Sequence, residues 1–392
     1  MRVNRKSMIM VSVLSFCVLV LGISLASAAG VTAGTTLQQM VFLQIGNTTA
    51  KVGDEYKTLD SAPVIVNGRT MVPVRFITES LGLQVRWDPT TRTVVFGPQG
   101  VDLNAVPLPA GVTGVGTDKY VSNPDDFASK TAVNWQEMTT VRVDLTEMAF
   151  TPKNLTFEAG KPYKLEVRNS GEVKHEFAAD SFFRSIALRK VEDGQAEIKL
   201  PFLSEVEVFA GKQADLYFVP LIPGTYEMLC EITGHREAGM EGTITVTGTP
   251  VATPEIQLGN VAEAFGVPNS AALVKQADWN NLDIVNFELG EMFFRPNPLY
   301  LKVGKPYKIQ LKNVGEVKHE LDAEAFFRTA AIRKVQDASV EVKGPSFNEI
   351  EVFASQQTDV YLIPTKAGTY EVACRIPGHY EAGMKATLVV GE

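Results

Sequence analysis

The sequence predicts a mainly β protein built from two copies of one sandwich-like domain. Residues 135–248 and 279–392 align without a gap and share about half of their residues, so the second segment repeats the first. Within each copy, short segments such as 214–218 alternate apolar and polar residues, and Gly or Pro separates them. A period of two places one face of each strand in a core, and short strands punctuated by turns are typical of β-sandwiches. A small α+β unit at residues 38–97 is expected to precede the two copies.

The first 28 residues have the features of a secretory signal. Basic residues among the first eight precede an apolar run at 9–25, and small residues follow at 26–28. This order is typical of signal peptides and predicts cleavage before Ala29. A retained membrane anchor is the alternative, since the run approaches the length that spans a bilayer. We therefore expect an exported protein that is extracellular, attached to the cell envelope or periplasmic.

Residues 38–97 predict a unit of strands and one helix. The expected elements are a strand at 41–45, a hairpin turn at Asn67-Gly68, a helix at 73–81 ended by Gly82, and a strand at 93–96. The run from Val66 to Phe76, with Trp87-Asp88 behind it, resembles the copper amine oxidase N-terminal-like domain. That resemblance implies a non-catalytic stalk that associates with the cell envelope. The unit contains no His or Cys, so we expect no metal site there.

Two segments are expected to be linkers. Residues 98–134 are rich in Gly, Pro, Val, Asp and Ser and show no clear periodicity, which is typical of connecting segments. Residues 249–278 join the two repeats.

Each repeat carries its own set of sulfur and imidazole side chains. The sets are His175, Cys230, His235 and Met240 in the first repeat, and His319, Cys374, His379 and Met384 in the second. Every member of the first set returns 144 residues later in the second, and the chain has no other His. Of the three Cys, only Cys17 falls outside, in the predicted signal. Two His, one Cys and a weak axial Met form the ligand set of blue-copper electron-transfer sites.

Other interpretations of these residues explain less. A lone His is more often a satisfied polar side chain, and a lone Met usually fills a core. An even number of Cys in an exported chain favours a disulfide, here Cys230 to Cys374, but a disulfide leaves the four His and two Met unexplained. Structural zinc uses four Cys or His ligands and makes no use of Met, so the set favours copper over zinc.

With these ligands in place, both repeats resemble the cupredoxins. The spacing Cys-x4-His-x4-Met is similar to the rusticyanin and auracyanin branch. The resemblance implies two Greek-key β-sandwiches, each with a type 1 blue copper ion that alternates between Cu(I) and Cu(II). It also implies that the two His and the Cys are equatorial ligands and that the Met is axial. Many cupredoxins have Asn directly after the first His, where it ties the ligand loops together, whereas this chain has Glu176 and Glu320.

The sequence therefore favours an electron-transfer protein with two copper ions. Copper storage or delivery is the main alternative, and a multicopper oxidase or nitrite reductase is another, because those enzymes also contain cupredoxin domains. All four His are used by the two sites, so none remains for a catalytic copper and we expect no enzyme activity. An envelope scaffold with secondary copper sites is a further alternative. Redox proteins such as a cytochrome or a membrane oxidase are the expected partners.

Two further features complete the prediction. The chain has a net charge of −8 and no basic run, which argues against nucleic acid as a partner. Residues 181–191, repeated at 325–335, predict a helix whose apolar stripe packs on the sandwich while Arg184 and Lys190 face outward. A docking patch for an acidic partner is the functional alternative for this helix.

Overall fold

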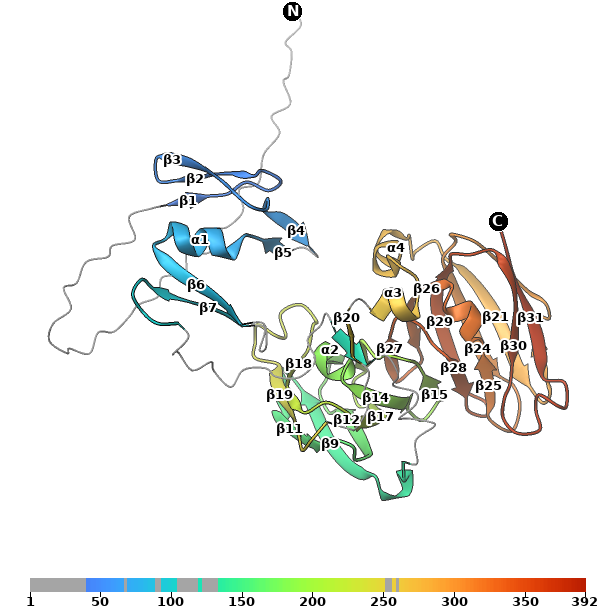
Figure 1. Cartoon of the computed structure of the whole chain (residues 1–392). Coiled ribbons are helices and arrows are strands. Elements are labelled where there is room, and N and C mark those ends of the chain that lie inside the picture. The colour runs from blue at the N-terminus through green and yellow to red at the C-terminus, as the bar shows by residue number, and fades with distance from the viewer. Residues whose placement is uncertain are drawn as a thin grey trace, which may run out of the picture. The chain divides into compact units, whose positions relative to one another are not determined.

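The computed structural model describes residues 40–66, 69–88, 93–103, 119–121, 133–250, 256–258 and 261–392. The protein is mainly β, as predicted, and its contacts divide it into two compact units, residues 1–107 and 108–392. Both units are drawn in Figure 1. The predicted signal segment lies outside the described residues. None of the helices in the described ranges has the length and apolar character that a membrane span requires.

In the residues that the structure describes, the first unit consists of short strands and one helix. Its elements are β1 (Val41–Phe42), β2 (Thr49–Val52), β3 (Glu55–Thr58), β4 (Val64–Val66), β5 (Arg69–Met71), α1 (Val74–Ser80), β6 (Leu83–Asp88) and β7 (Thr93–Pro98). Strands β1 to β3 form one antiparallel sheet, and β4–β5 and β6–β7 form two antiparallel pairs. The first strand is shorter than the predicted 41–45, and the predicted turn at 67–68 lies outside the described residues.

Helix α1 begins and ends where the sequence predicts. Pro73 precedes its first residue, where a missing backbone N–H has no cost. Gly82 has a φ of +75°, and its N–H donates to the Glu79 carbonyl at 3.0 Å. Only glycine adopts that left-handed conformation without strain, so the chain leaves the helix at this position.

Both repeats form β-sandwiches in the second unit. The first repeat contains β9 (Thr139–Thr146), β10 (Ala149–Thr151), β11 (Asn154–Glu158), β12 (Tyr163–Asn169), β13 (His175–Ala178), α2 (Asp180–Phe183), β14 (Ile186–Glu192), β15 (Ala196–Lys199), β16 (Glu205–Val208), β17 (Gln213–Pro220), β18 (Gly224–Leu229) and β19 (Glu241–Thr247). The second contains β21 (Asp283–Gly290), β22 (Phe293–Arg295), β23 (Leu299–Lys302), β24 (Tyr307–Asn313), β25 (His319–Asp322), α5 (Glu324–Phe327), β26 (Ala330–Gln336), β27 (Val340–Lys343), β28 (Glu349–Val352), β29 (Gln357–Pro364), β30 (Gly368–Ala373) and β31 (Lys385–Gly391).

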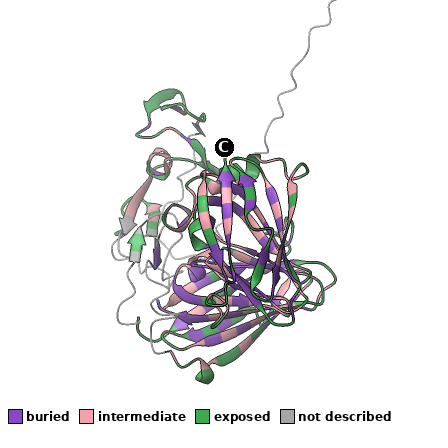
Figure 2. Cartoon of the chain, turned by 90° about the vertical axis from the view of Figure 1, so that its right-hand side faces the viewer, coloured by how far each residue is buried: buried purple, intermediate pink, exposed green. Residues whose placement is uncertain are grey.

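Alternating residues of these strands face the core. In β12, for example, Tyr163, Leu165 and Val167 are buried while the residues between them are partly exposed. Figure 2 shows the same alternation of buried and exposed segments along the strands of the sandwiches. The period of two in the sequence therefore corresponds to strands with one face in a core.

The two repeats share both of their sheets. Each sheet has 11 strands and passes from one repeat into the other, through β15–β28 in one sheet and β16–β27 in the other. These four strands, labelled in part in Figure 1, are called the seam below. Backbone hydrogen bonds repeat across the seam: the Ser204 N–H donates to the Lys343 carbonyl, and the Asn348 N–H to the Lys199 carbonyl, each at 2.8 Å. The repeats are thus related as the subunits of an isologous dimer are.

The prediction of a helix at 181–191, and of its repeat at 325–335, is wrong. Only one helical turn forms, α2 or α5, and the following residues extend into β14 or β26, which pair with β17 or β29. Strand pairing and burial of residues such as Ile186 outweigh the local helical pattern, which is a weak prior. Arg184 pairs with Asp180 at 3.0 Å and Lys190 with Glu197 at 2.8 Å, so neither faces outward as a free cation.

Both expected linkers contain regular structure. Strand β8 (Lys119–Val121) pairs with β20 (Ile256–Leu258), and two short helices follow, α3 (Val261–Phe265) and α4 (Ser270–Gln276). Phe265 of α3 packs on Tyr120 and Phe202, with ring centroids 5.7 and 4.9 Å apart. The segment that joins the repeats is therefore packed against them.

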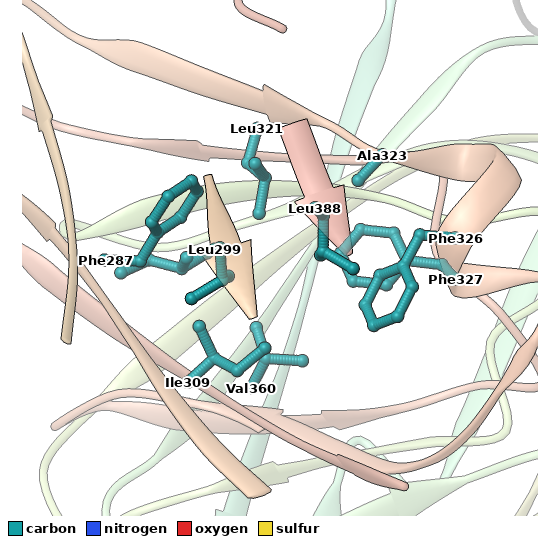
Figure 3. A pocket seen from close by; sticks show the side chains of 10 residues that line it. Phe287, Leu299, Ile309, Leu321, Ala323, Phe326, Phe327, Val360 and Leu388 are labelled. Atoms are coloured by element: carbon teal, nitrogen blue, oxygen red, sulfur yellow. The ribbon is translucent and has the colours of Figure 1, made fainter. Parts of the chain in front are cut away.

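The core of the second repeat contains a small apolar gap. Figure 3 shows it between side chains that include Phe287, Ile309, Leu321, Phe326 and Val360. Where this repeat has Leu321, the first repeat has the larger Phe177. No polar atom lines the gap, so it offers a water molecule no hydrogen bond.

Enlarging this gap is expected to lower stability. In Ile309→Val, a buried side chain loses one methylene beside space that is already empty, so we expect a loss of about 1 kcal/mol in the free energy of unfolding. Urea denaturation measures it. The control is Lys312→Ala on the exposed face of the same strand, for which we expect less than about 0.5 kcal/mol. Equal losses in the two variants would contradict the packing argument.

Candidate metal centres

A buried asparagine fixes the loop before the first histidine. Asn169 ends β12, and its side-chain amide donates to the carbonyls of Val173 and Val208 at 2.7 and 2.8 Å. Its side-chain oxygen accepts the N–H of Gly171 at 2.9 Å. His175 then begins β13. Asn313 makes the same three bonds before His319 in the second repeat.

One short loop carries the remaining three side chains of each set. Strand β18 ends at Leu229, so Cys230 follows the strand directly, as predicted. The Cys230 N–H donates to the Met240 carbonyl at 3.1 Å, and the Met240 N–H donates to the His235 carbonyl at 3.0 Å. The second repeat has the same two bonds among Cys374, His379 and Met384 at the same distances. Backbone geometry therefore fixes the relative positions of Cys, His and Met in each loop.

The structure brings the predicted side chains together. In the first repeat, His235 Nδ1 lies 3.2 Å from His175 Nδ1 and 3.4 Å from Cys230 Sγ. In the second, Cys374 Sγ lies 3.3 Å from His379 Nδ1. In each set, one atom from each of the two His and the Cys lies within 4.8 Å of the others. Met240 and Met384 are fully buried on the same loops.

The donor atoms suit a soft metal ion. Both ring nitrogens of His319 and the Nε2 of His175 are buried without a hydrogen-bond partner. Cys230 and Cys374 are both free and buried, so the alternative of a disulfide between them is wrong. Unpaired buried nitrogen beside buried thiol sulfur is costly unless something binds these atoms, and a metal ion would satisfy them.

The acidic residue after the first histidine ties the two ligand loops together. The Glu176 N–H donates to Cys230 Sγ at 3.4 Å, and the Glu176 carboxylate accepts the N–H of Glu231 at 3.1 Å. Glu320 does the same, with bonds from its N–H to Cys374 Sγ and from the Arg375 N–H to its carboxylate. A carboxylate thus bridges the two loops at the position where many cupredoxins have the amide of Asn. The loops are still tied together, and only the chemical group that ties them differs.

Burial sets the protonation of the site. Burial and the neighbouring second histidine lower the pKa of His175 and of His319, which leaves these rings neutral and able to bind a metal. Burial raises the pKa of Cys230 and of Cys374, so a metal ion must displace a proton from each thiol. Burial and a nearby second carboxylate raise the pKa of Glu176 and of Glu320 to about 7.

Sequence reasoning missed two supporting residues in each repeat. Asn169 and Asn313 are the loop anchors described above, and Glu147 and Glu291 are the others. The Glu316 N–H, in the loop before His319, donates to Glu291 Oε1 at 2.6 Å, and that oxygen lies 3.8 Å from His319 Nε2. The only available signal was that each Asn and each Glu has an identical residue at the equivalent position of the other repeat. A structural role also explains that recurrence.

Comparison with protein families follows this division of the chain. Residues 21–96 match the copper amine oxidase N-terminal domain. Residues 127–246 match the cupredoxin-like domain, and residues 284–391 match the copper binding proteins of the plastocyanin/azurin family. The chain contains two cupredoxin-like domains in tandem. We refer to the first and second repeats as cupredoxin domains 1 and 2 from here on.

Individual relatives are more distant. The copper-resistant cuproprotein CopI of Pseudomonas aeruginosa is 27% identical over 157 residues, covering 33% of this chain and 83% of that protein. CopI of Rubrivivax gelatinosus is 29% identical over 99 residues, covering 25% of this chain and 60% of that protein. A Cu-containing nitrite reductase (NirK) from Thermus scotoductus matches at 15% identity and a TM-score of 0.23, over 64% of this chain and 61% of that one. That likeness carries no argument about activity.

The two cupredoxin domains differ at the rim of the ligand loop. In domain 1, Arg236 follows the second histidine and pairs with Glu227 at 2.7 Å, and His235 is 9% exposed. In domain 2, Tyr380 takes the place of Arg236, with the Arg375 guanidinium 4.4 Å from its ring centre, and His379 is half-buried. The two centres therefore differ in the charged and aromatic side chains beside the second histidine.

Proposed function

We propose that this protein carries one copper ion in each cupredoxin domain and transfers electrons through them. The observation that carries the proposal is the doubled cluster: two imidazole nitrogens and one thiol sulfur lie within 4.8 Å of one another in both domains. His175, Cys230 and His235 would be the equatorial ligands in domain 1, and His319, Cys374 and His379 in domain 2. Met240 and Met384 would be axial. Copper in this environment supplies a one-electron Cu(II)/Cu(I) couple.

Rigidity supports a carrier over a copper store. A carrier must present nearly the same geometry to both oxidation states, whereas a store must release its ion. The ligand loop is closed by the backbone bonds of Cys230, His235 and Met240, and the first His begins a strand that is paired to β16. Ligands held by packed elements in this way keep one arrangement. Storage or delivery of copper remains the competing function, because it would use the same ligands.

The ligand inventory also supports a carrier over a copper enzyme. Oxidases and nitrite reductases need a second copper held mainly by imidazoles with an open position for substrate. This chain has four His in total, and both clusters use all of them. No histidine is therefore left for a catalytic copper.

The side of the ligand loop that carries the second histidine is the proposed route for electrons. His379 is half-buried and His235 is buried, and each directly follows an exposed glycine, Gly378 or Gly234, so both lie close to the surface. A redox protein such as a cytochrome or a membrane oxidase would contact this rim briefly, with little buried area. Export, cell-envelope association through the N-terminal domain and the absence of a nucleic-acid partner remain parts of the proposal.

Redox cycling beside a Cu(I) chelator tests the carrier against the store. We expect both ions to remain bound through repeated reduction with ascorbate and reoxidation with ferricyanide, because the fold holds the ligands in place. The measurement is the copper content and the visible absorption of the protein after each cycle. Removal of both ions on the first reduction would show that the protein stores or delivers copper. Turnover of oxygen or nitrite by the copper-loaded protein at about 1 per second or faster would instead show an enzyme.

A further inference from the structure

Each metal centre is connected to the seam between the domains through the residue after its first histidine. Strand β13, which carries His175 and Glu176, pairs with β16, and β16 pairs with β27 of domain 2. In this ladder Glu176 lies opposite Glu207, and Glu207 lies opposite Glu341. Alternate residues of a strand share a face, so these carboxylates lie on the face opposite the apolar core.

A lysine of domain 2 reaches this row of carboxylates. Lys343 ends β27 and lies opposite Glu205 of domain 1, with which its Nζ forms an ion pair. The same Nζ lies 3.2 Å from Glu341 and 3.8 Å from Glu176 Oε1. Its backbone is fixed as well, because the Lys343 carbonyl accepts the Ser204 N–H at 2.8 Å. Lys343 therefore lies at a defined position beside the metal centre of the opposite domain.

Glu176 transmits this contact to the ligands. Its N–H donates to Cys230 Sγ, and its other carboxylate oxygen, Oε2, accepts the N–H of Glu231, directly after the cysteine. One residue thus contacts the thiol sulfur, the cysteine loop and Lys343 of the other domain. A change at Lys343 therefore removes a contact from the residue whose N–H donates to the ligand sulfur.

The arrangement is reciprocal. Lys199 of domain 1 occupies the position equivalent to Lys343, ends β15 and pairs with Glu349 of domain 2. The Lys199 carbonyl accepts the Asn348 N–H at 2.8 Å, as the Lys343 carbonyl accepts that of Ser204. Glu349 in turn lies opposite Asp322 of β25, the strand that carries Glu320, and the Glu320 N–H donates to Cys374 Sγ.

We propose that Lys343 is a positioning residue for the metal centre of domain 1, and Lys199 for that of domain 2, so that each centre is tuned by the opposite domain. The inference rests on the proposed function, because it concerns the copper bound at these centres. If each centre is tuned by a lysine of the opposite domain, the two domains form one functional unit. Neither centre would keep that neighbouring lysine without the other domain.

The expected effect is a change in the preference of a centre for Cu(I) over Cu(II). Removing a cation near the thiolate favours the more highly charged Cu(II). We therefore expect Lys343→Met to lower the ratio of the Cu(I) to the Cu(II) association constant of centre 1 by about threefold to tenfold. Methionine keeps the length of the apolar stem while removing the charge, and Lys343→Arg, which keeps the charge, is expected to restore the ratio.

The experiment isolates one centre at a time. In the full-length Cys374→Ser protein only centre 1 retains its thiolate, and the two association constants are measured by competition with Cu(I) and Cu(II) chelators at pH 8. Lys343→Met is compared there with Lys199→Met, which removes the equivalent charge from the same seam. The full-length Cys230→Ser protein provides the reverse comparison for centre 2. We expect each lysine to affect only the centre of the opposite domain.

Several outcomes decide the inference. An unchanged ratio for centre 1 in Lys343→Met overturns it, and so does an equal change in Lys199→Met, because a purely structural role at the seam affects both centres alike. If Lys343→Met does not fold, Lys199→Met acting on centre 2 provides the same decision. If the Cys374→Ser protein binds no copper through its remaining thiolate, the proposed function itself fails, and this inference fails with it.

Discussion

Replacing Cys230 with Ser is expected to remove about half of the visible copper absorption and to leave centre 2 intact. The thiolate gives a type 1 centre its charge-transfer band, and serine supplies no such ligand. Cys230 and Cys374 lie in separate domains and have their own imidazole partners, so each should act independently in binding the ion. Metal analysis and absorption spectra of protein loaded with Cu(II) measure the result.

The matched control is Cys374→Ser, which should remove the other half, and the double variant should have no band. Wild-type protein is expected to bind two ions, one per domain. A wild-type ratio near one, or a Cys230→Ser protein with the full band, would contradict independent centres.

The stability gain of the Asp337→Asn variant over the wild type is expected to be larger at pH 8 than at pH 5 by roughly 2 kcal/mol. Asp337 belongs to domain 2. Gln195 of domain 1 connects it to Asp193, because its side-chain amide donates to Asp337 Oδ1 at 3.2 Å and its backbone N–H donates to Asp193 Oδ1 at 2.8 Å. Burial and the charge of Asp193 raise the pKa of Asp337 from 3.8 to about 7. Its Oδ1 accepts N–H groups from Ser339 and Val340 at 2.7 and 3.0 Å, which an asparagine oxygen also accepts.

The direction follows from proton binding. Between pH 4 and 7 the folded protein holds a proton on Asp337 that the unfolded chain has released, so the stability of the wild type falls as the pH rises through this window. Asparagine does not ionise, and its amide can donate to Asp193, so the variant avoids this loss. Urea denaturation at pH 5 and pH 8 measures the difference.

The control is Asp193→Asn, which removes the other partner of the same pair and should give the same pH-dependent gain. A gain of equal size at both pH values would show that the pKa of Asp337 is not raised in the folded protein.

The expected effects of Cys230→Ser and Asp337→Asn differ because the two residues lie at different distances from the seam. Centres 1 and 2 have separate ligand sets, but the strands that carry His175 and His319 each lie one strand away from the opposite domain. Gln195 of domain 1 donates to both Asp193 and Asp337 across the same boundary. Variants near the seam can therefore affect both domains, whereas variants in a ligand loop should affect one.

The sequence by itself determined many of the strands, the repeat and the recurring sets of His, Cys and Met. Strands such as β12 and β19 were predictable because a half-buried strand leaves a period of two in the sequence. The clusters were predictable because three members lie within one short loop, and because the repeat shows each set twice. Chemistry that depends on residue type and local spacing can be predicted from the sequence.

The tertiary structure alone decided the features that depend on distant neighbours. Residues 186–192 have a helical pattern but form β14, because pairing with β17 outweighs local preference. The bridging role of Glu176 depends on Glu231 and Lys343, which are far away in the sequence. The shared sheets could not be predicted for the same reason. Strands β15 and β16 would be the edges of a single repeat, and they pair with the second repeat through backbone groups. Backbone hydrogen bonding leaves no mark on residue identity.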